Sequence, residues 1–294
     1  MRGMRRATAL ATALLIAGGP GWAQDAGDDW DFGENREQKL SIAAVSFENF
    51  GVAVRCMDGS LSVLMAGLPE DGGRRTLSYR IGQGPEHASD WISARGATTA
   101  FAFWPRAVAR DLSEGGRLTV TVPTDSGQRR ITADLPPSRA AIARVFQACG
   151  RELTSAETLD APREQNFGGL EWVREPDGSF PDRARYADGI AAVQCRVRAN
   201  GHLSGCTIES EFPEGSGFGR AAVLAGHRTG KVGPADGGTA DIEGRLINYT
   251  MRYGIIDGYL TPPPSRRADR DEADNDLPPE DEAGPSRRNA ASSA

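Results

Sequence analysis

Lysine is nearly missing from this chain of 294 residues, which has only Lys39 and Lys231 beside its many arginines. Acidic residues outnumber Lys and Arg by 40 to 34, and no stretch of the chain is rich in lysine. A negatively charged protein repels the phosphates of nucleic acids and the headgroups of anionic lipids. We therefore expect neither nucleic acid nor an anionic membrane surface as a partner.

Residue patterns typical of enzymes are missing as well. The three histidines are His87, His202 and His227, and the last two are predicted at a hairpin turn and at a helix end. No serine stands in the strand–turn–helix pattern G-x-S-x-G, no phosphate-binding glycine loop follows a predicted strand, and the cysteines lack the C-x-x-C spacing of zinc sites. We expect no catalytic residue, no cofactor and no metal, and an enzyme is only the third hypothesis.

The chain has a single long apolar run, residues 7–18, close to its first residue. Arginines precede the run, Gly19-Pro20-Gly21 follows it, and Gly21 and Ala23 are small residues of the kind that signal peptidase reads. The run is shorter than the roughly twenty residues that a membrane span needs. These features predict a signal peptide at residues 1–23 and a periplasmic mature protein without a membrane span. The alternative is a retained anchor in the inner membrane, with the rest of the chain facing the periplasm.

Four cysteines, all in the mature part, indicate two disulfides, because exported proteins fold where thiols are oxidised. Four cysteines allow three pairings. The predicted helix at residues 139–149 places Cys149 on its apolar stripe, and Cys56 ends an apolar strand. This arrangement favours a Cys56–Cys149 disulfide that joins the helix to a sheet.

The order of polar and apolar segments divides the mature chain into five parts. They are a flexible acidic lead-in at residues 24–39, a β-rich domain at 40–150, a linker at 151–178, a second domain at 179–254, and a tail at 262–294 with too few apolar residues to fold, which we predict to be disordered. Apolar runs between turn signals predict strands in the first domain at residues 41–47, 52–56, 61–67, 76–81, 99–103, 118–122 and 130–133. Helices are expected at residues 105–114 and 139–149. The predicted fold class is α+β.

The second domain contains the clearest local signal, a β-hairpin around Asn200 and Gly201. Alternating residues on both sides predict two strands joined by a two-residue type I′ turn, because both turn positions accept a positive φ. Facing residues then have numbers that add up to 401, which places Cys195 opposite Cys206. In this register the two cysteines form a hydrogen-bonded pair with Cα atoms about 5.5 Å apart, within the range of a disulfide.

Five short motifs follow one another in this domain. They are Phe180-Pro181-Asp182-Arg183-Ala184, Cys195-Arg196-Val197-Arg198-Ala199-Asn200-Gly201, Cys206-Thr207-Ile208-Glu209, Phe218-Gly219-Arg220-Ala221-Ala222 and Val232-Gly233-Pro234-Ala235-Asp236-Gly237-Gly238. With a helix predicted at residues 218–227 and a strand at 242–253, their order resembles the C-terminal domain of the TonB family of energy transducers. The resemblance implies a small domain of hairpin, helix and final strand. The chain departs from the family before this domain, where a β-rich unit replaces the family's Pro-rich spacer.

The resemblance also implies a function, the binding of a partner peptide by strand addition at an exposed sheet edge. The edge that it implies is the final strand, where Leu246, Asn248, Thr250 and Arg252 alternate with a packed set; an interior position of this strand is the alternative. The partner would be an outer-membrane receptor or another envelope protein, and the family's strand exchange allows a dimer. A TonB-type energy transducer in transmembrane transport, which needs a retained N-terminal anchor, is the second hypothesis.

Overall fold

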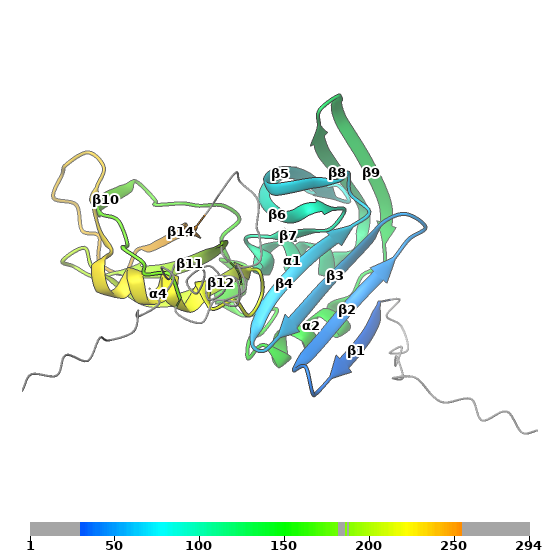
Figure 1. Cartoon of the computed structure of the whole chain (residues 1–294), viewed down its shortest axis with the longest axis horizontal. Coiled ribbons are helices and arrows are strands. Elements are labelled where there is room, and N and C mark those ends of the chain that lie inside the picture. The colour runs from blue at the N-terminus through cyan, green and yellow to red at the C-terminus, as the bar shows by residue number, and fades with distance from the viewer. Residues whose placement is uncertain (1–29, 182–185, 187, 255–294) are drawn as a thin grey trace, which may run out of the picture.

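The computed structural model describes residues 30–181, 186 and 188–254 (Figure 1). The predicted signal peptide at residues 1–23, the beginning of the lead-in and the tail at residues 262–294 lie outside these ranges. Strands predominate and helices are few, so this part of the chain is a β-rich fold with some helices. None of the helices in these ranges combines the length and the apolar character that crossing a bilayer requires.

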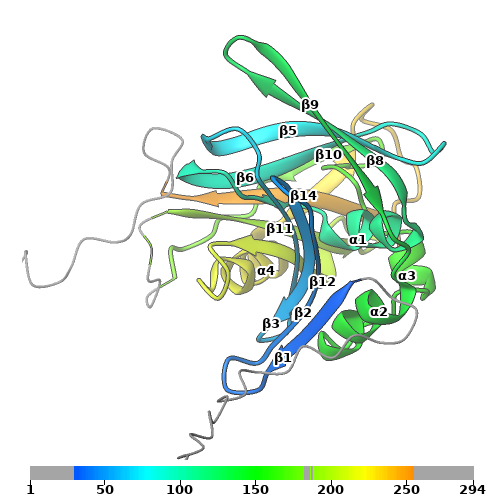
Figure 2. The same ribbon diagram turned by 90° about the vertical axis from the view of Figure 1, so that its right-hand side faces the viewer.

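The larger sheet has nine strands, and each neighbouring pair is antiparallel (Figure 1). Along the chain they are β1 (Asp31–Asn35), β2 (Leu40–Ser46), β3 (Gly51–Met57), β4 (Ser60–Ala66), β5 (Asp71–Ile81), β6 (His87–Ala97), β7 (Ala100–Ala102), β8 (Gly116–Thr124) and β9 (Gly127–Leu135). Across the sheet the order is β1-β2-β3-β4-β7-β6-β5-β8-β9. Figure 2 shows how strongly this sheet curves.

Two helices, α1 (Pro105–Glu114) and α2 (Arg139–Ala148), pack against this sheet (Figure 2). Pro105 begins α1, where its fixed φ suits a first helical turn and its missing N–H is not needed. Ile142, Val145 and Phe146 of the apolar stripe predicted for α2 are buried, and Cys149 is half-buried. A disulfide joins Cys149, at the end of this helix, to Cys56 in β3, with 5.6 Å between their Cα atoms. This bond ties helix to sheet, as the stripe predicted.

The chain joins the large sheet earlier than its sequence predicted. Residues 30–39 belong to the sheet and its first turn, whereas the acidic composition predicted a flexible lead-in for residues 24–39. The reason is apolar surface: Trp30 is fully buried and Phe32 of β1 is 3% exposed. The indole Nε1 of Trp30 also donates a hydrogen bond of 2.9 Å to the carbonyl of Pro136, near the start of α2.

The segment between the two units, residues 151–178, is packed against its neighbours. It contains the short helix α3 (Ala156–Leu159) and the strand β10 (Leu170–Arg174). Arg106 of α1 donates a hydrogen bond of 2.8 Å to the carbonyl of Glu157. The sequence predicted a linker here, and in the structure side chains of the large unit hold this segment in place.

The smaller unit is a three-stranded antiparallel sheet with one helix on it (Figure 1). Its strands are β11 (Gly189–Val197) in the centre, flanked by β12 (Leu203–Phe212) and β14 (Leu246–Tyr253). Helix α4 (Phe218–Thr229) covers one face, where it contributes to a second hydrophobic core. The strand β13 (Lys231–Pro234) pairs with β10 beside this sheet.

The other face of the small sheet packs against the large unit. A third apolar cluster lies at this contact, formed by Ile92, Phe103, Trp104, Ile190 and Ala192. The hydroxyl of Ser210 donates a hydrogen bond of 2.7 Å to the carbonyl of Phe103, and ion pairs join Arg106 to Glu209 and Arg55 to Glu214. The two units are therefore fixed to each other by apolar, hydrogen-bonded and charged contacts.

Candidate functional site

Strand β14 lies at one end of the small sheet, where the sequence placed a partner-binding edge. The sequence predicted a solvent-exposed face of β14, but in the structure only the two ends of this face are exposed. Leu246 is 42% exposed and Arg252 is exposed, whereas Asn248 is 9% exposed and Thr250 is half-buried. The cause is packing, because the Asn248 side chain accepts a hydrogen bond of 3.0 Å from Gln194 on the face that meets the large unit.

A short piece of the connecting segment covers the middle of the outer edge of β14. The amide of Asn248 donates to the carbonyl of Asn166 over 2.7 Å, and the amide of Asn166 donates to the carbonyl of Asn248 over 2.9 Å. The side-chain oxygen of Gln165 accepts hydrogen bonds from the amide and the hydroxyl of Thr250, at 3.2 and 3.0 Å. Asn166 thus forms the pair of main-chain hydrogen bonds that an added strand would form at this position.

Replacing Gln165 by Ala removes the acceptor of the Thr250 amide and leaves the main chain of Asn166 in place. We expect the Thr250 amide hydrogen to exchange faster, with a loss of about 0.5–1.5 kcal/mol in the free energy of unfolding. Hydrogen exchange followed by NMR measures both effects. The Asn248 amide is the internal control, because its acceptor is the Asn166 carbonyl; equal acceleration at both amides would show that the whole segment detaches.

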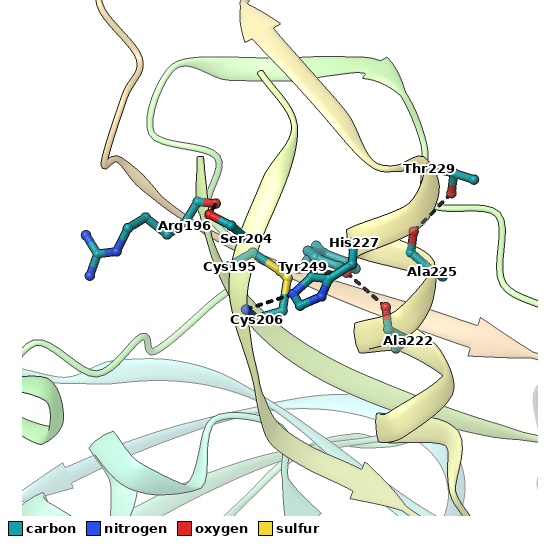
Figure 3. Close-up of a disulfide and its surroundings, with 9 residues drawn as sticks. All are labelled: Cys195, Arg196, Ser204, Cys206, Ala222, Ala225, His227, Thr229 and Tyr249. Carbon is teal, nitrogen blue, oxygen red and sulfur yellow. Dashed lines mark hydrogen bonds between the residues drawn. A yellow bond between two sulfur atoms is a disulfide. The ribbon is translucent and has the colours of Figure 1, made fainter. Parts of the chain in front are cut away.

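The disulfide between Cys195 and Cys206 joins β11 to β12 beneath α4 (Figure 3). Cys195 is fully buried and Cys206 is half-buried. The amide of Cys206 donates a hydrogen bond of 3.2 Å to Nε2 of His227 on α4, and the hydroxyl of Tyr249 on β14 donates one of 3.3 Å to the carbonyl of Ala222. All three strands and the helix are connected here. The disulfide therefore stabilises the face of the small sheet that α4 covers, including β14.

The turn of this hairpin differs from the two-residue turn that the sequence predicted. The amide of Arg198 donates to the carbonyl of His202 over 2.9 Å, which leaves a three-residue loop that ends at Gly201 with φ +81°. A bulge at Gly205, with φ +54°, then adds one residue to β12 and restores the predicted register beyond it. Cys195 lies opposite this bulge, so its Cα atom is 4.0 Å from that of its partner and not the 5.5 Å of a regular pair.

A buried charged network lies between the small sheet and α1 of the large unit. Nε of Arg106 donates a hydrogen bond of 2.8 Å to Oε2 of Glu209, and its Nη2 donates to Oε1 of the same carboxylate and, over 3.2 Å, to the side chain of Gln194. The two charged side chains are 4% and 0% exposed. Because Gln194 also binds Asn248, the network runs from α1 of the large unit to β14.

A groove of about 680 Å³ runs along the outer side of α4. We call it the α4 groove; its walls are residues 177–181, residues 215–217 and the α4 side chains Arg220, Leu224 and Arg228. Phe180 and Leu224 are each 42% exposed. Within the described ranges, neither of the two arginines forms an ion pair or a hydrogen bond. The groove is therefore apolar in part and carries positive charge from α4.

A second polar cluster lies in the large unit, beside a cavity of about 370 Å³. The hydroxyl of Tyr79 donates a hydrogen bond of 2.9 Å to Asp111, Arg163 binds both oxygens of this carboxylate, and Nε2 of His87 is 4.0 Å from it. Burial raises the pKa of the Asp111 carboxyl, but hydrogen bonds and charge from Arg163 outweigh burial and hold this pKa below its usual value. Burial likewise raises the pKa of Tyr79, so the hydroxyl stays protonated. The cluster fixes Arg163 of the connecting segment to the large unit.

This cluster gives the protein a pH-dependent stability. Burial, together with the charge of Arg163, lowers the pKa of the His87 imidazole, although Asp111 opposes this shift. The unfolded chain therefore binds a proton near pH 6.5 that the folded chain does not bind, so stability falls as the pH is lowered through about 6.5. Urea unfolding of His87→Gln should show a flatter dependence on pH between about 6.5 and 5 than the original protein. Gln83→Ala, in the neighbouring loop, should keep the original slope, and an unchanged slope in His87→Gln would exclude His87 as the cause.

Sequence reasoning missed the residues that surround the β14 edge. Gln165 and Asn166 stand in a polar stretch without any repeat or motif, and Arg106 is one of many arginines. The one available signal was Glu209, an acidic residue in a strand that otherwise alternates, where the structure has a second bulge. Such a break in alternation is typical of a side chain that a bulge redirects.

The comparisons with known proteins do not identify the chain. No family model matches it, and neither the curated proteins nor the solved structures give a match. Within residues 30–181, 186 and 188–254, no group of three His, Cys, Asp or Glu side chains is placed to hold a metal ion. The β14 edge and its surroundings are therefore the features from which function is inferred.

Proposed function

We propose that this chain is an exported, periplasmic protein-binding module that takes an extended segment of a partner protein as an additional strand on β14. The observation that carries the proposal is the antiparallel bridge between Asn166 and Asn248. It supports strand addition because a residue from elsewhere in the chain already pairs with the outward main-chain groups of Asn248 in β14. The partner class is an outer-membrane receptor or another protein of the cell envelope.

Other features support an exported scaffold for this edge. Two disulfides suit an oxidising compartment, and one of them joins β11, the strand that pairs with β14, to β12. The order of hairpin, helix and final strand in the small unit is the order that the resemblance to TonB C-terminal domains implies. Main-chain hydrogen bonds give affinity only if the edge is held in place, and here the large unit and α4 hold both faces of the small sheet.

A partner strand has two routes to this edge. It can pair beside Arg252 at the exposed end of β14, or it can displace Gln165 and Asn166 from the middle. Displacement breaks two main-chain hydrogen bonds and the contacts of one exposed side chain. An added strand would replace those main-chain bonds, so the exchange costs little beyond the ordering of the partner.

Photo-cross-linking in the cells that make the protein tests the proposal. A benzophenone amino acid at Arg252 should label one envelope protein, and the same group at Thr132, an exposed residue of β9, should not. At Thr250 the yield should increase when Gln165→Ala loosens the cover. Identical products from Arg252 and Thr132, or no product from Arg252 and Thr250, would overturn strand addition on β14.

The N-terminus of the protein isolated from cells distinguishes the proposal from its alternative. We expect a chain in the periplasmic fraction that begins near Gln24. A chain that keeps Met1 and sediments with the inner membrane would instead favour the energy transducer.

A further inference from the structure

We infer that the α4 groove binds the C-terminal segment of this same chain, residues 255–282. The inference does not depend on strand addition at β14, because the groove and the outer edge of β14 are different surfaces. It rests on the exposed apolar side chains of the groove, on two arginines that have no ion-pair or hydrogen-bond partner in the part of the chain that the structure describes, and on the place where that part ends.

The groove exposes apolar surface that a bound segment would remove from water. Phe180 and Leu224 are two of the five large apolar side chains that are exposed in the described ranges, and both line the groove. The ring of Phe180 is held on one side by Phe218 and Tyr253, with centroids 5.4 and 6.2 Å away. A fixed and exposed aromatic ring beside an exposed leucine is typical of a contact surface.

The charges of the groove select an acidic occupant. Arg220 and Arg228 are eight residues apart on α4, which places them about 12 Å apart along the helix axis. Among the described residues that line the groove, Asp177 is the one acidic residue. Two arginines without partners in the described ranges therefore face one carboxylate, in a chain whose acidic residues outnumber its basic ones.

The chain itself carries a segment of this chemistry next to the groove. The described part ends at Gly254, one residue after Tyr253, whose ring lies 4.9 Å from Phe218 at the first residue of α4. The next six residues are Ile255, Ile256, Asp257, Gly258, Tyr259 and Leu260, and residues 269–282 contain eight acidic residues and one arginine. Six extended residues span about 20 Å, close to the length of about 18 Å of the twelve-residue helix α4.

Covalent attachment makes a modest contact sufficient. A segment joined to the site by a short connection has an effective concentration in the millimolar range. Ile255, Ile256, Tyr259 and Leu260 would cover Phe180 and Leu224, and the acidic side chains of residues 269–282 would lie against Arg220 and Arg228.

Intramolecular cross-linking in the purified full chain tests this inference. A benzophenone amino acid at Leu224 should give products that mass spectrometry maps to residues 255–282. The same group at Leu159, an exposed leucine of the large unit, is the matched control and should give no such product. Products at Leu224 that map only to residues 30–254, or no products, would overturn the inference.

Two further arms test the charges and the source of the segment. The exchange of Arg220 and Arg228 for Glu should lower the yield severalfold, while the same exchange at Arg129 and Arg130 of β9 should not. An increase from about 0.05 to 0.5 M salt should lower the yield of the unmodified chain as well, because salt screens exposed charges. In an equal mixture of 14N- and 15N-labelled chains the products should join residues of one label; mixed-label products would replace the inference with contact between two copies.

Discussion

Replacing Glu209 by Ala in the full-length chain should lower its free energy of unfolding by about 3–5 kcal/mol, the usual cost of leaving one member of a buried ion pair without its partner. The guanidinium of Arg106 is 4% exposed and directs two of its nitrogens at this carboxylate. Without Glu209, the acceptors that this guanidinium keeps in the described part of the chain are the Gln194 side chain and the Glu157 carbonyl. Urea-induced unfolding, followed by tryptophan fluorescence, measures the loss.

Two variants make this result specific. Arg106→Met combined with Glu209→Leu should recover most of the loss, because an apolar pair carries no buried charge. Glu114→Ala breaks the exposed ion pair with Arg139 and should cost less than about 1 kcal/mol. A loss below 1 kcal/mol in Glu209→Ala would show that water reaches Arg106, and the contact between the two units would then be looser than described.

Removal of the Cys56–Cys149 disulfide is expected to have the second large effect. Changing both cysteines to Ala releases a loop with a sequence separation of 93 residues. The chain-entropy model gives about 4–5 kcal/mol for a loop of that size. The double variant should unfold at a correspondingly lower urea concentration than the original protein under the same non-reducing conditions.

The second disulfide supplies the comparison. Cys195 and Cys206 are only 11 residues apart, so the same model gives about 3 kcal/mol for their double Ala variant. The order of the two losses is the decisive result. If the Cys195–Cys206 variant lost more than the Cys56–Cys149 variant, loop length would not govern the effect, and the contacts that this disulfide supports under α4 would be the cause.

Most strands of the large sheet could be predicted, because apolar runs between turn residues mark them. Strand β6 could not, since its buried inward positions include Ser89 and Ser93, which give no apolar alternation. Strand β1 was not predicted either, because its acidic residues lie within the segment that was predicted to be a flexible lead-in. Its one signal was the spacing of Trp30 and Phe32, two aromatic residues two positions apart, as on one face of a strand.

The candidate site was partly predictable for a related reason. The disulfides follow from local patterns, a helical stripe and a hairpin, which one sequence contains. The position of β14 at a sheet edge followed from the resemblance, and the structure has the strand at that edge. Two contacts around β14 could not be predicted. Asn166 pairs with Asn248, 82 positions along the chain, and Arg106 pairs with Glu209, 103 positions along the chain. No local sequence pattern encodes contacts between residues so far apart.

The antiparallel pairing of β14 with β11 has a mechanical consequence. A pull along β14 acts parallel to the strands, so the hydrogen bonds between them share the load and must break together. From β11 the load passes to β12 through the Cys195–Cys206 bond, and from β12 to α1 through Glu209 and Arg106. A force applied at the edge of the small sheet therefore reaches the large unit through a covalent bond and an ion pair.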